Sequence, residues 1–111
     1  MTGKKGEDIA AELLKNKGYA IVDRNWRNKF GEIDIITKKD GVLVFVEVKT
    51  KKGELFGLPE EMVGFGKLQK VRHMATVYMN GKEIPCRIDV VAVVLSEDGQ
   101  VTRLTHYENV Y

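Results

Sequence analysis

Residues 31–49 read GEIDIITKKDGVLVFVEVK, and this stretch decides the fold. Asp40-Gly41 separates two runs rich in Ile and Val, which is a strong signal for a two-residue hairpin turn. Counting outward from that turn places Asp34 opposite Glu47. Directly opposed side chains of an antiparallel pair have Cβ atoms roughly 4.5–5.5 Å apart. The hairpin therefore predicts two neighbouring carboxylates.

Two like charges at that separation destabilise a sheet unless something neutralises them. A divalent cation such as Mg²⁺ is the natural candidate, because it takes carboxylate oxygens as ligands, and we expect Mn²⁺ to substitute for it. The two-residue period of a strand also keeps Lys49 on the face of Glu47. This predicts a metal-dependent hydrolase site. Asp34 and Glu47 would hold the cation, and the carbonyl of Val48 could add a ligand. Lys49 would orient or help deprotonate a water, or stabilise charge on a phosphate oxygen.

A plainer interpretation is open as well. The same charges, with Glu32, could pair off at a solvated strand end, and a register shift of one residue would separate the acids. Glu7 has two interpretations too. It could add a third carboxylate from the first helix, or it could simply meet the positive end of the helix dipole.

The flanking sequence predicts an α/β domain over residues 1–111, with a mixed central sheet flanked by helices. Gly18 and Gly81 are placed to end the two main helices. Gly64-Phe65-Gly66 should interrupt a helical pattern that begins near Pro59. Asp89 interrupts an apolar strand, and pairing with Arg87 or with a helix lysine is its expected role. The expected order is a helix at 3–17, strands at 19–27, 32–38 and 42–50, a helix at 67–79, and strands at 87–95 and 100–107.

Basic residues provide candidate contacts to a nucleic-acid backbone. They cluster at the start of the second long helix and at the ends of strands, although a charge run is more commonly a solvated face. Phosphate contacts of this kind give a salt-dependent affinity that does not depend on base sequence. The candidates are Arg27, Lys51, Lys67, Gln69 and Lys70.

Composition adds only broad limits. The chain has 111 residues, 43% hydrophobic and 31% charged, with a net charge of +2, so nucleic-acid binding does not follow from total charge. Its one cysteine, Cys86, cannot form an internal disulfide. No secretory signal or apolar run long enough to span a bilayer is visible, so a cytoplasmic location and no membrane partner are expected.

The split pattern of Asp34 followed by Glu47-x-Lys49, preceded by a helix that carries Glu7, resembles the restriction-endonuclease-like superfamily, written PD-(D/E)XK. The segments GEID, FVEVK, KLQKVRHMATVYM and RIDVVAVV more narrowly resemble the YraN-type family of small bacterial proteins within it. The likeness extends from about residue 6 to residue 95. Ile33 stands where the nominal signature has proline, which relatives also commonly lack.

The resemblance implies a core of helix, three strands, helix and strand. It implies that Asp34 and Glu47 bind metal, that Lys49 is the catalytic lysine, and that Glu7 matches the helix glutamate of the archaeal junction-resolvase branch. Gln69 is a looser match to a polar residue on the second core helix. The expected activity is an Mg²⁺-dependent endonuclease acting on DNA, including branched or junction DNA, where a homodimer would suit a symmetric substrate.

Two alternatives remain. One is a non-catalytic module that binds nucleic acid or a partner while it keeps the fold. The other is a hydrolase of a small phosphorylated molecule, for which the short chain offers little material to build a deep pocket.

Overall fold

The computed structural model describes residues 2–53 and 63–111. The elements are α1 (Thr2–Asn16), β1 (Ala20–Asn28), β2 (Gly31–Lys39), β3 (Val42–Lys52), α3 (Phe65–Met79), β4 (Cys86–Leu95) and β5 (Val101–Tyr107). The strands form one sheet in the order β1-β2-β3-β4-β5. Only β3 and β4 run parallel, and the other neighbours are antiparallel. The expected α/β architecture with a mixed sheet is confirmed.

The central hairpin has the predicted turn and register. Asp40 and Gly41 both have positive φ, 51° and 80°, which is the conformation that a two-residue turn between twisted strands requires. Lys39 pairs with Val42, so the count from the turn is correct. The paired ladder of β2 and β3 then ends at Ile35–Val46, just before the two predicted acids.

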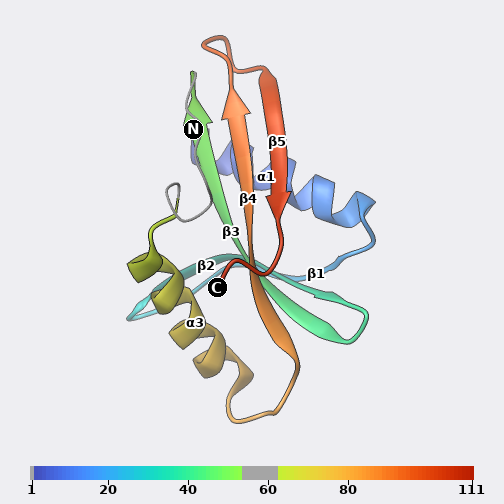
Figure 1. Ribbon diagram of the computed structural model, residues 1–111, viewed down its shortest axis with the longest axis vertical. Coiled ribbons are helices and arrows are strands. Elements are labelled where there is room, and N and C mark those ends of the chain that lie inside the picture. The colour runs from blue at the N-terminus through green and yellow to red at the C-terminus, as the bar shows by residue number, and fades with distance from the viewer. Residues whose placement is uncertain (1, 54–62) are drawn as a thin grey trace.

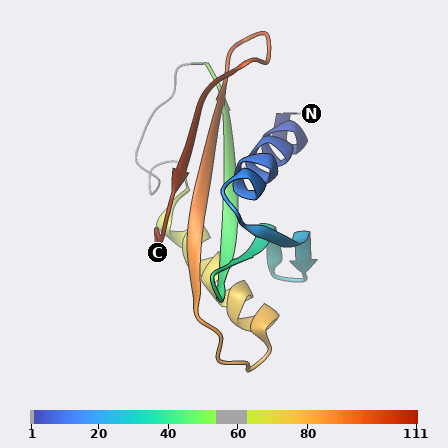
Figure 2. The same ribbon diagram turned by 90° about the vertical axis from the view of Figure 1, so that its right-hand side faces the viewer.

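Two apolar clusters pack on opposite faces of the sheet. Phe45 of β3 belongs to the cluster that contains Leu68 of α3, whereas its neighbour Val44 belongs to the cluster that contains Leu14 of α1. Since successive strand residues point to opposite faces, α1 and α3 cover different faces. Both views show α1 nearer the upper half of the sheet and α3 nearer its lower end (Figures 1 and 2). The strand β4, buried from Ile88 to Leu95, lies between them, as its continuous apolar run predicted.

The ends of the helices agree with the sequence except at the start of α3. Gly18 follows α1 with φ of 90°, and Asn80 and Gly81 end α3 with φ of 50° and 82°. The predicted break at Gly64-Phe65-Gly66 is wrong in part, because α3 begins at Phe65 and includes Gly66. The N–H of Leu68 donates to the Gly64 carbonyl, and burial of Leu68 offsets the roughly 1 kcal/mol that a helical glycine costs.

Two further expectations concern the segment after β3. The predicted loop and the short helical turn near Pro59 fall mainly on residues 54–62, which lie outside the described residues. Within the described ranges, no helix is long and apolar enough to cross a membrane.

Candidate metal centre at the β2–β3 fork

Asp34 and Glu47 lie where β2 separates from β3. The ladder of paired residues stops at Ile35–Val46, and beyond it the Val48 N–H donates to Asp34 Oδ2 at 2.8 Å instead of to a β2 carbonyl. Both acids are nearly inaccessible to solvent, with 8% and 6% of their surfaces exposed. The carboxylate of Asp34 thus takes the place of a backbone acceptor. This hydrogen bond holds the carboxylate beside the first residues of β3 that no longer pair with β2.

The two acids perturb each other electrostatically. Burial, followed by the negative charge of Asp34, raises the pKa of Glu47 to about 8. Burial also raises the pKa of Asp34, although the hydrogen bond from Val48 N–H opposes the shift. Glu47 Oε2 is buried and has no hydrogen-bond partner among the described residues. A buried acceptor left in this state is uncommon in folded proteins and indicates that a further partner belongs here.

Glu7 and Glu32 bring two more carboxylates to Asp34. One oxygen from each of these three residues lies within 4.8 Å of the others, which is close enough for a single metal ion to reach all three. Glu7 comes from α1, which sits so close to β3 that a Cβ added at Gly6 would overlap the hydroxyl of Thr50. This close approach carries Glu7 to the fork. The cluster Glu7, Glu32, Asp34 and Glu47 is called the acid cluster below.

The residues on β1 hold the outer side of the acid cluster. Arg27 forms an ion pair with Glu32 at 2.6 Å, and the side-chain amide of Asn25 donates to Glu7 Oε1 at 2.8 Å. Arg24 lies 4.0 Å from the same Glu7 oxygen. Asn25 has φ of 55°, an unfavourable conformation for a residue within a strand. In this conformation the Asn25 side chain makes the hydrogen bond that orients Glu7.

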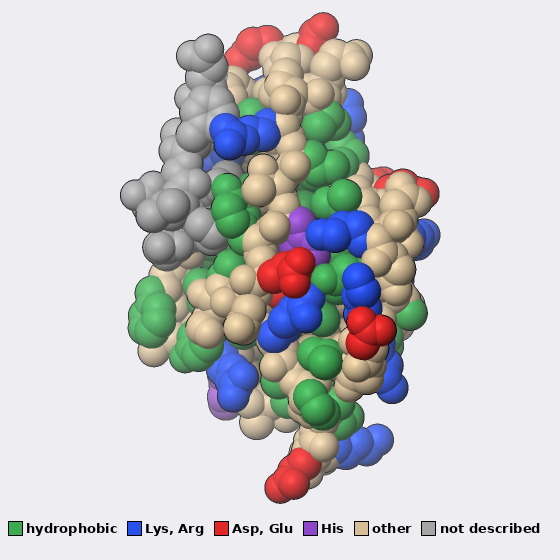
Figure 3. Space-filling view, turned by 45° about the vertical axis from the view of Figure 1, so that its right-hand side comes forward, with side chains coloured by type: hydrophobic (Ala, Val, Ile, Leu, Met, Phe, Trp, Pro, Cys, Tyr) green, Lys and Arg blue, Asp and Glu red, His purple; other side chains and the backbone are tan. Residues whose placement is uncertain are grey.

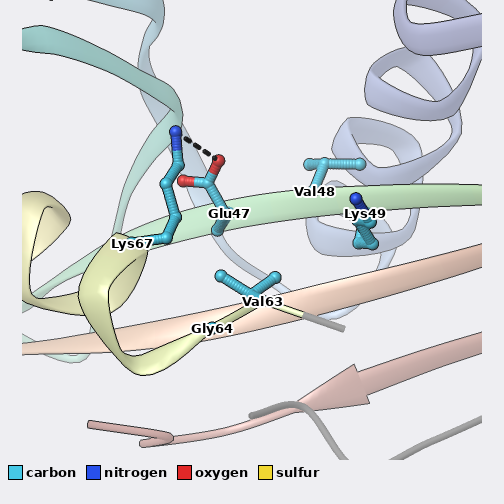
Figure 4. A pocket seen from close by; sticks show the side chains of 6 residues that line it. All are labelled: Glu47, Val48, Lys49, Val63, Gly64 and Lys67. Carbon is cyan, nitrogen blue, oxygen red and sulfur yellow. Dashed lines mark ion pairs between the residues drawn. The ribbon is translucent and has the colours of Figure 1, made fainter. Parts of the chain in front are cut away.

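Two lysines lie near Glu47: Lys49, as predicted, and Lys67, which was predicted only as a nucleic-acid contact. Lys67, in the first turn of α3, approaches Glu47 Oε1 at 3.7 Å. Lys49 lines the same pocket of about 400 Å³ but forms no ion pair with any described residue. Figure 4 shows the Glu47 carboxylate pointing toward Lys67, whereas Lys49 lies farther along β3. The pocket thus has an acidic end and a cationic side chain that is available to an anionic ligand.

The remaining basic candidates do not form one surface with these lysines. Arg27 belongs to the outer side of the acid cluster, and Lys51 is partly buried on β3. Gln69 and Lys70 line a separate pocket against Phe30. The structure therefore brings Arg27 and Lys67 to the acids, and it places Gln69 and Lys70 beside another opening.

A second polar cluster surrounds Asp89 on β4. Arg87 donates to both of its carboxylate oxygens at 3.0 and 3.3 Å, His106 Nε2 lies 2.7 Å from Oδ2, and the Asn109 N–H donates to Oδ1 at 2.9 Å. The predicted pairing with Arg87 is confirmed. Acidic and basic side chains gather around a histidine near the middle of the face seen in Figure 3. Asp89 is completely buried, yet its carboxylate is satisfied.

Glu32 is the acid that the sequence argument left out of the metal ligands. It precedes Asp34 by two residues on β2, so the strand period by itself puts both on one side. That signal is present in GEID, whereas the hairpin count singles out only the two acids that lie directly opposite each other. Glu47, predicted as a ligand, interacts with Asp34. It is not one of the three acids, Glu7, Glu32 and Asp34, whose oxygens lie within 4.8 Å of one another.

The comparisons with known proteins agree on a family. Residues 6–93 match the model of the family described as Uncharacterised protein family UPF0102. A UPF0102 protein of Dictyoglomus turgidum is 38% identical over 98% of this chain and 95% of its own length. Those of Desulforamulus reducens and Clostridium botulinum (strain 657) are 41% and 45% identical, over 96% and 85% of this chain and 92% and 80% of their own lengths. The family-level part of the resemblance, to YraN-type proteins, is confirmed, and this chain belongs to the UPF0102 family.

Proposed function

We propose that this protein is a metal-dependent nuclease that hydrolyses phosphodiester bonds in DNA, including branched or junction DNA. The observation that carries the proposal is the convergence of four carboxylates from α1, β2 and β3 at one fork in the sheet. One of their oxygens, Glu47 Oε2, is buried without a partner among the described residues.

The donor set fits a hard divalent cation. Mg²⁺ and Mn²⁺ prefer carboxylate oxygens. Glu7, Glu32 and Asp34, whose oxygens lie within 4.8 Å of one another, would hold the ion, and Glu47 beside Asp34 would add a further ligand. Such an ion, when bound, polarises a phosphoryl oxygen and lowers the pKa of a bound water. The raised pKa of Glu47 supports the same assignment, because a neighbouring cation would stabilise the ionised form that burial disfavours.

The other residues of the site supply orientation and positive charge. Lys49 reaches the pocket without an ion-pair partner in the described chain, so its ammonium group can contact the attacking water or a phosphate oxygen. Arg27 and Lys67 flank the acids on opposite sides and would position the phosphates next to the bond that is cleaved. Lys51 lies farther along β3 and would extend this backbone contact.

A second candidate is a DNA-binding module without catalysis. It is favoured by the ion pairs that Glu7, Glu32 and Glu47 already make with Arg24, Arg27 and Lys67, since these partly neutralise the cluster without metal. In that case binding would depend on salt and would need no divalent ion. The orphaned Glu47 oxygen argues for the nuclease, because a purely structural cluster has no need of it.

The test is cleavage of labelled duplex, single-stranded, flap and four-way-junction DNA in Mg²⁺, Mn²⁺ or EDTA. Wild type is compared with Asp34→Asn, Glu47→Gln and Lys49→Met, purified identically. Asp40→Asn is the matched control, because it makes the same chemical change at an exposed carboxylate in the hairpin turn.

Metal-dependent products from wild type and Asp40→Asn, lost in Asp34→Asn and Glu47→Gln, support the nuclease. If all of these proteins bind DNA equally in EDTA and none cleaves it in either metal, the proposal is wrong and the binding module stands. Equal cleavage by wild type and Glu47→Gln would show that the activity comes from a contaminant or another site.

A further inference from the structure

A second pocket opens between the β1–β2 turn and α3, separate from the one beside Glu47. Its volume is about 470 Å³. It is lined by Phe30, Gly66, Gln69, Lys70, His73 and Met74. The turn is held firmly against the helix, since a Cβ added at Gly31 would come within 3.1 Å of Met74 Sδ. The pocket is therefore formed by packed elements before any ligand arrives.

An exposed aromatic ring forms one wall of this pocket. Phe30 has 56% of its surface exposed although it is a large apolar side chain. The His73 ring meets it edge to face, at 5.8 Å between centroids and 84° between planes. The Lys29 ammonium lies 5.2 Å from the Phe30 centroid. An exposed ring beside cations is the arrangement on which nucleic-acid bases stack.

The charge around the pocket has one sign. Within residues 2–53 and 63–111, no acidic residue lines it and neither Lys29 nor Lys70 forms an ion pair. This contrasts with the acid cluster, where Arg24, Arg27 and Lys67 each face a carboxylate. Two ammonium groups that face no described carboxylate, beside an apolar wall, complement a ligand that has a flat apolar part and a phosphate.

The pocket is linked to the acid cluster through both of its walls. Phe30 lies in the turn before β2 and precedes Glu32 by two positions, so the two are at most about 7 Å apart along the chain. Lys70 follows Lys67 by three residues, close to one helical turn of about 5.4 Å. A DNA strand with a phosphate at the acids could therefore place a nearby base in the pocket.

We propose that this pocket takes an unpaired DNA base, which stacks on Phe30 while Lys29 and Lys70 contact the adjoining phosphates. The Gln69 side chain would hydrogen-bond to the edge of the base. A base inside a duplex is stacked and paired, so the pocket selects substrates with a single-stranded segment beside the site of cleavage. This inference rests on the proposed nuclease function and specifies its substrate.

The contact that Lys29 makes with Phe30 does not block the base. An exposed cation–π contact is weaker than the stacking of a base on an aromatic ring, so a base can displace the lysine from the ring face. Lys29 is exposed and flexible, and once displaced it remains near the phosphates of the same strand.

Binding is measured separately from cleavage, by fluorescence anisotropy with the Glu47→Gln protein in Mg²⁺. The probes are a flap with a single-stranded arm, the same flap with abasic spacers in the arm next to the junction, and a blunt duplex of equal length. The variants, each made in the Glu47→Gln background, are Phe30→Ala, Phe30→Trp and Phe65→Ala. Phe65 is the matched control, because it is also an exposed phenylalanine, at 63%, and it does not line the pocket.

Phe30→Ala should weaken flap binding by roughly tenfold to a hundredfold, leave duplex binding unchanged and abolish the difference between normal and abasic arms. Phe30→Trp should restore tight binding, and Phe65→Ala should behave like the parent. Equal losses on flap and duplex, or equal losses in Phe30→Ala and Phe65→Ala, would overturn the inference. If binding follows the expected pattern while the wild type never cleaves, the nuclease proposal fails and the base pocket stands.

Discussion

Asp34 and Asp89 are both buried on the same sheet, yet their surroundings shift their pKa values in opposite directions. Burial tends to raise the pKa of Asp89, but hydrogen bonds from His106 and Arg87 outweigh it and lower the pKa. Burial raises the pKa of Asp34, and the hydrogen bonds from the Val48 N–H and from Glu47 do not compensate. The same residue type at similar depth is thus an ionised structural anchor in one region and a destabilised group in the other.

The comparison separates a structural carboxylate from a functional candidate. Asp89 joins β4 to β5 and to the segment that follows it, through His106 and Asn109, and all its acceptor sites face donors. In the acid cluster, by contrast, Glu47 Oε2 is buried and has no hydrogen-bond partner among the described residues. The contacts of Asp89 stabilise the folded state, whereas the buried acid cluster destabilises it. The acid cluster therefore needs another explanation, such as metal binding.

The largest effect should come from Asp89→Ala. Removing this carboxylate breaks its bonds with the buried His106 side chain and with Arg87, which keeps only Glu108 and the Tyr19 hydroxyl among the described residues, so the free energy of unfolding should fall by about 3–5 kcal/mol. Urea denaturation at pH 7 measures it. Glu12→Ala, an exposed acid on α1, is the control and should change stability by less than about 0.5 kcal/mol. A loss below about 1 kcal/mol for Asp89→Ala would remove the contrast between the two aspartates.

Glu47→Gln should act in the opposite direction. Because the folded pKa of Glu47, about 8, lies above its ordinary 4.5, the stability from its protonated form is complete below pH 4.5 and is lost as pH rises through 8. At 1.36 kcal/mol per unit this is at most about 5 kcal/mol, and the open pocket reduces it to about 2–4 kcal/mol. Urea titrations in EDTA at pH 5, 7 and 9 should show wild-type stability falling and the variant more stable at pH 9.

The pH dependence of stability has the opposite sign for Asp89, which provides a second test of the two pKa shifts. Its lowered pKa means that its contribution is present above about pH 3.8 and is lost as pH falls through the folded value. Wild-type protein should therefore lose stability at strongly acidic pH as well as at alkaline pH. If Glu47→Gln kept the alkaline loss of the wild type, the pKa assignment to Glu47 would be wrong.

Metal should remove the instability of the acid cluster. At a Mg²⁺ or Mn²⁺ concentration about 100 times the dissociation constant, unfolding should cost about 2.7 kcal/mol more. Binding near pH 7 should also release protons, because Glu47 must ionise to coordinate. Thermal unfolding and calorimetry in two buffers measure the two effects. Asp40→Asn should respond like wild type and Asp34→Asn should not; equal responses of both variants would exclude this site.

The smallest effect concerns Lys67. Its ammonium lies 3.7 Å from Glu47 and is half-exposed, so the pair should contribute less than about 1 kcal/mol to stability. Lys67→Met should raise the pKa of Glu47 further, since the lysine is the described cation that lowers it. Titration of the Glu47 carboxyl carbon by NMR detects the change. Lys70→Met, one turn along α3, should leave this pKa unchanged, and an equal shift in both would point to a long-range charge effect.

The sequence alone determined the hairpin and most of the topology. Asp40-Gly41 allows the positive φ values of a two-residue turn, and a strand period of two then sets which side chains meet across it. The apolar run from Val90 to Leu95 in β4 is likewise typical of a strand covered on both faces. These are local patterns with strict geometry, so no tertiary information was needed. The start of α3 was predicted two residues too late, because glycine disfavours a helix and Gly66 was expected to lie outside it. Burial of Leu68 outweighs that unfavourable helix propensity.

Only the tertiary structure decided which acids form a group and which are satisfied. Glu7 and Glu32 lie beside Asp34 because α1 packs closely on β3 and because residues of β1 contact both glutamates. The spacing of residues along the sequence does not reveal these contacts. The same holds for Asp89, whose partner His106 is 17 positions away. The physical reason is that a buried carboxylate takes its character from donors brought by distant segments, and the chain encodes those only through the fold.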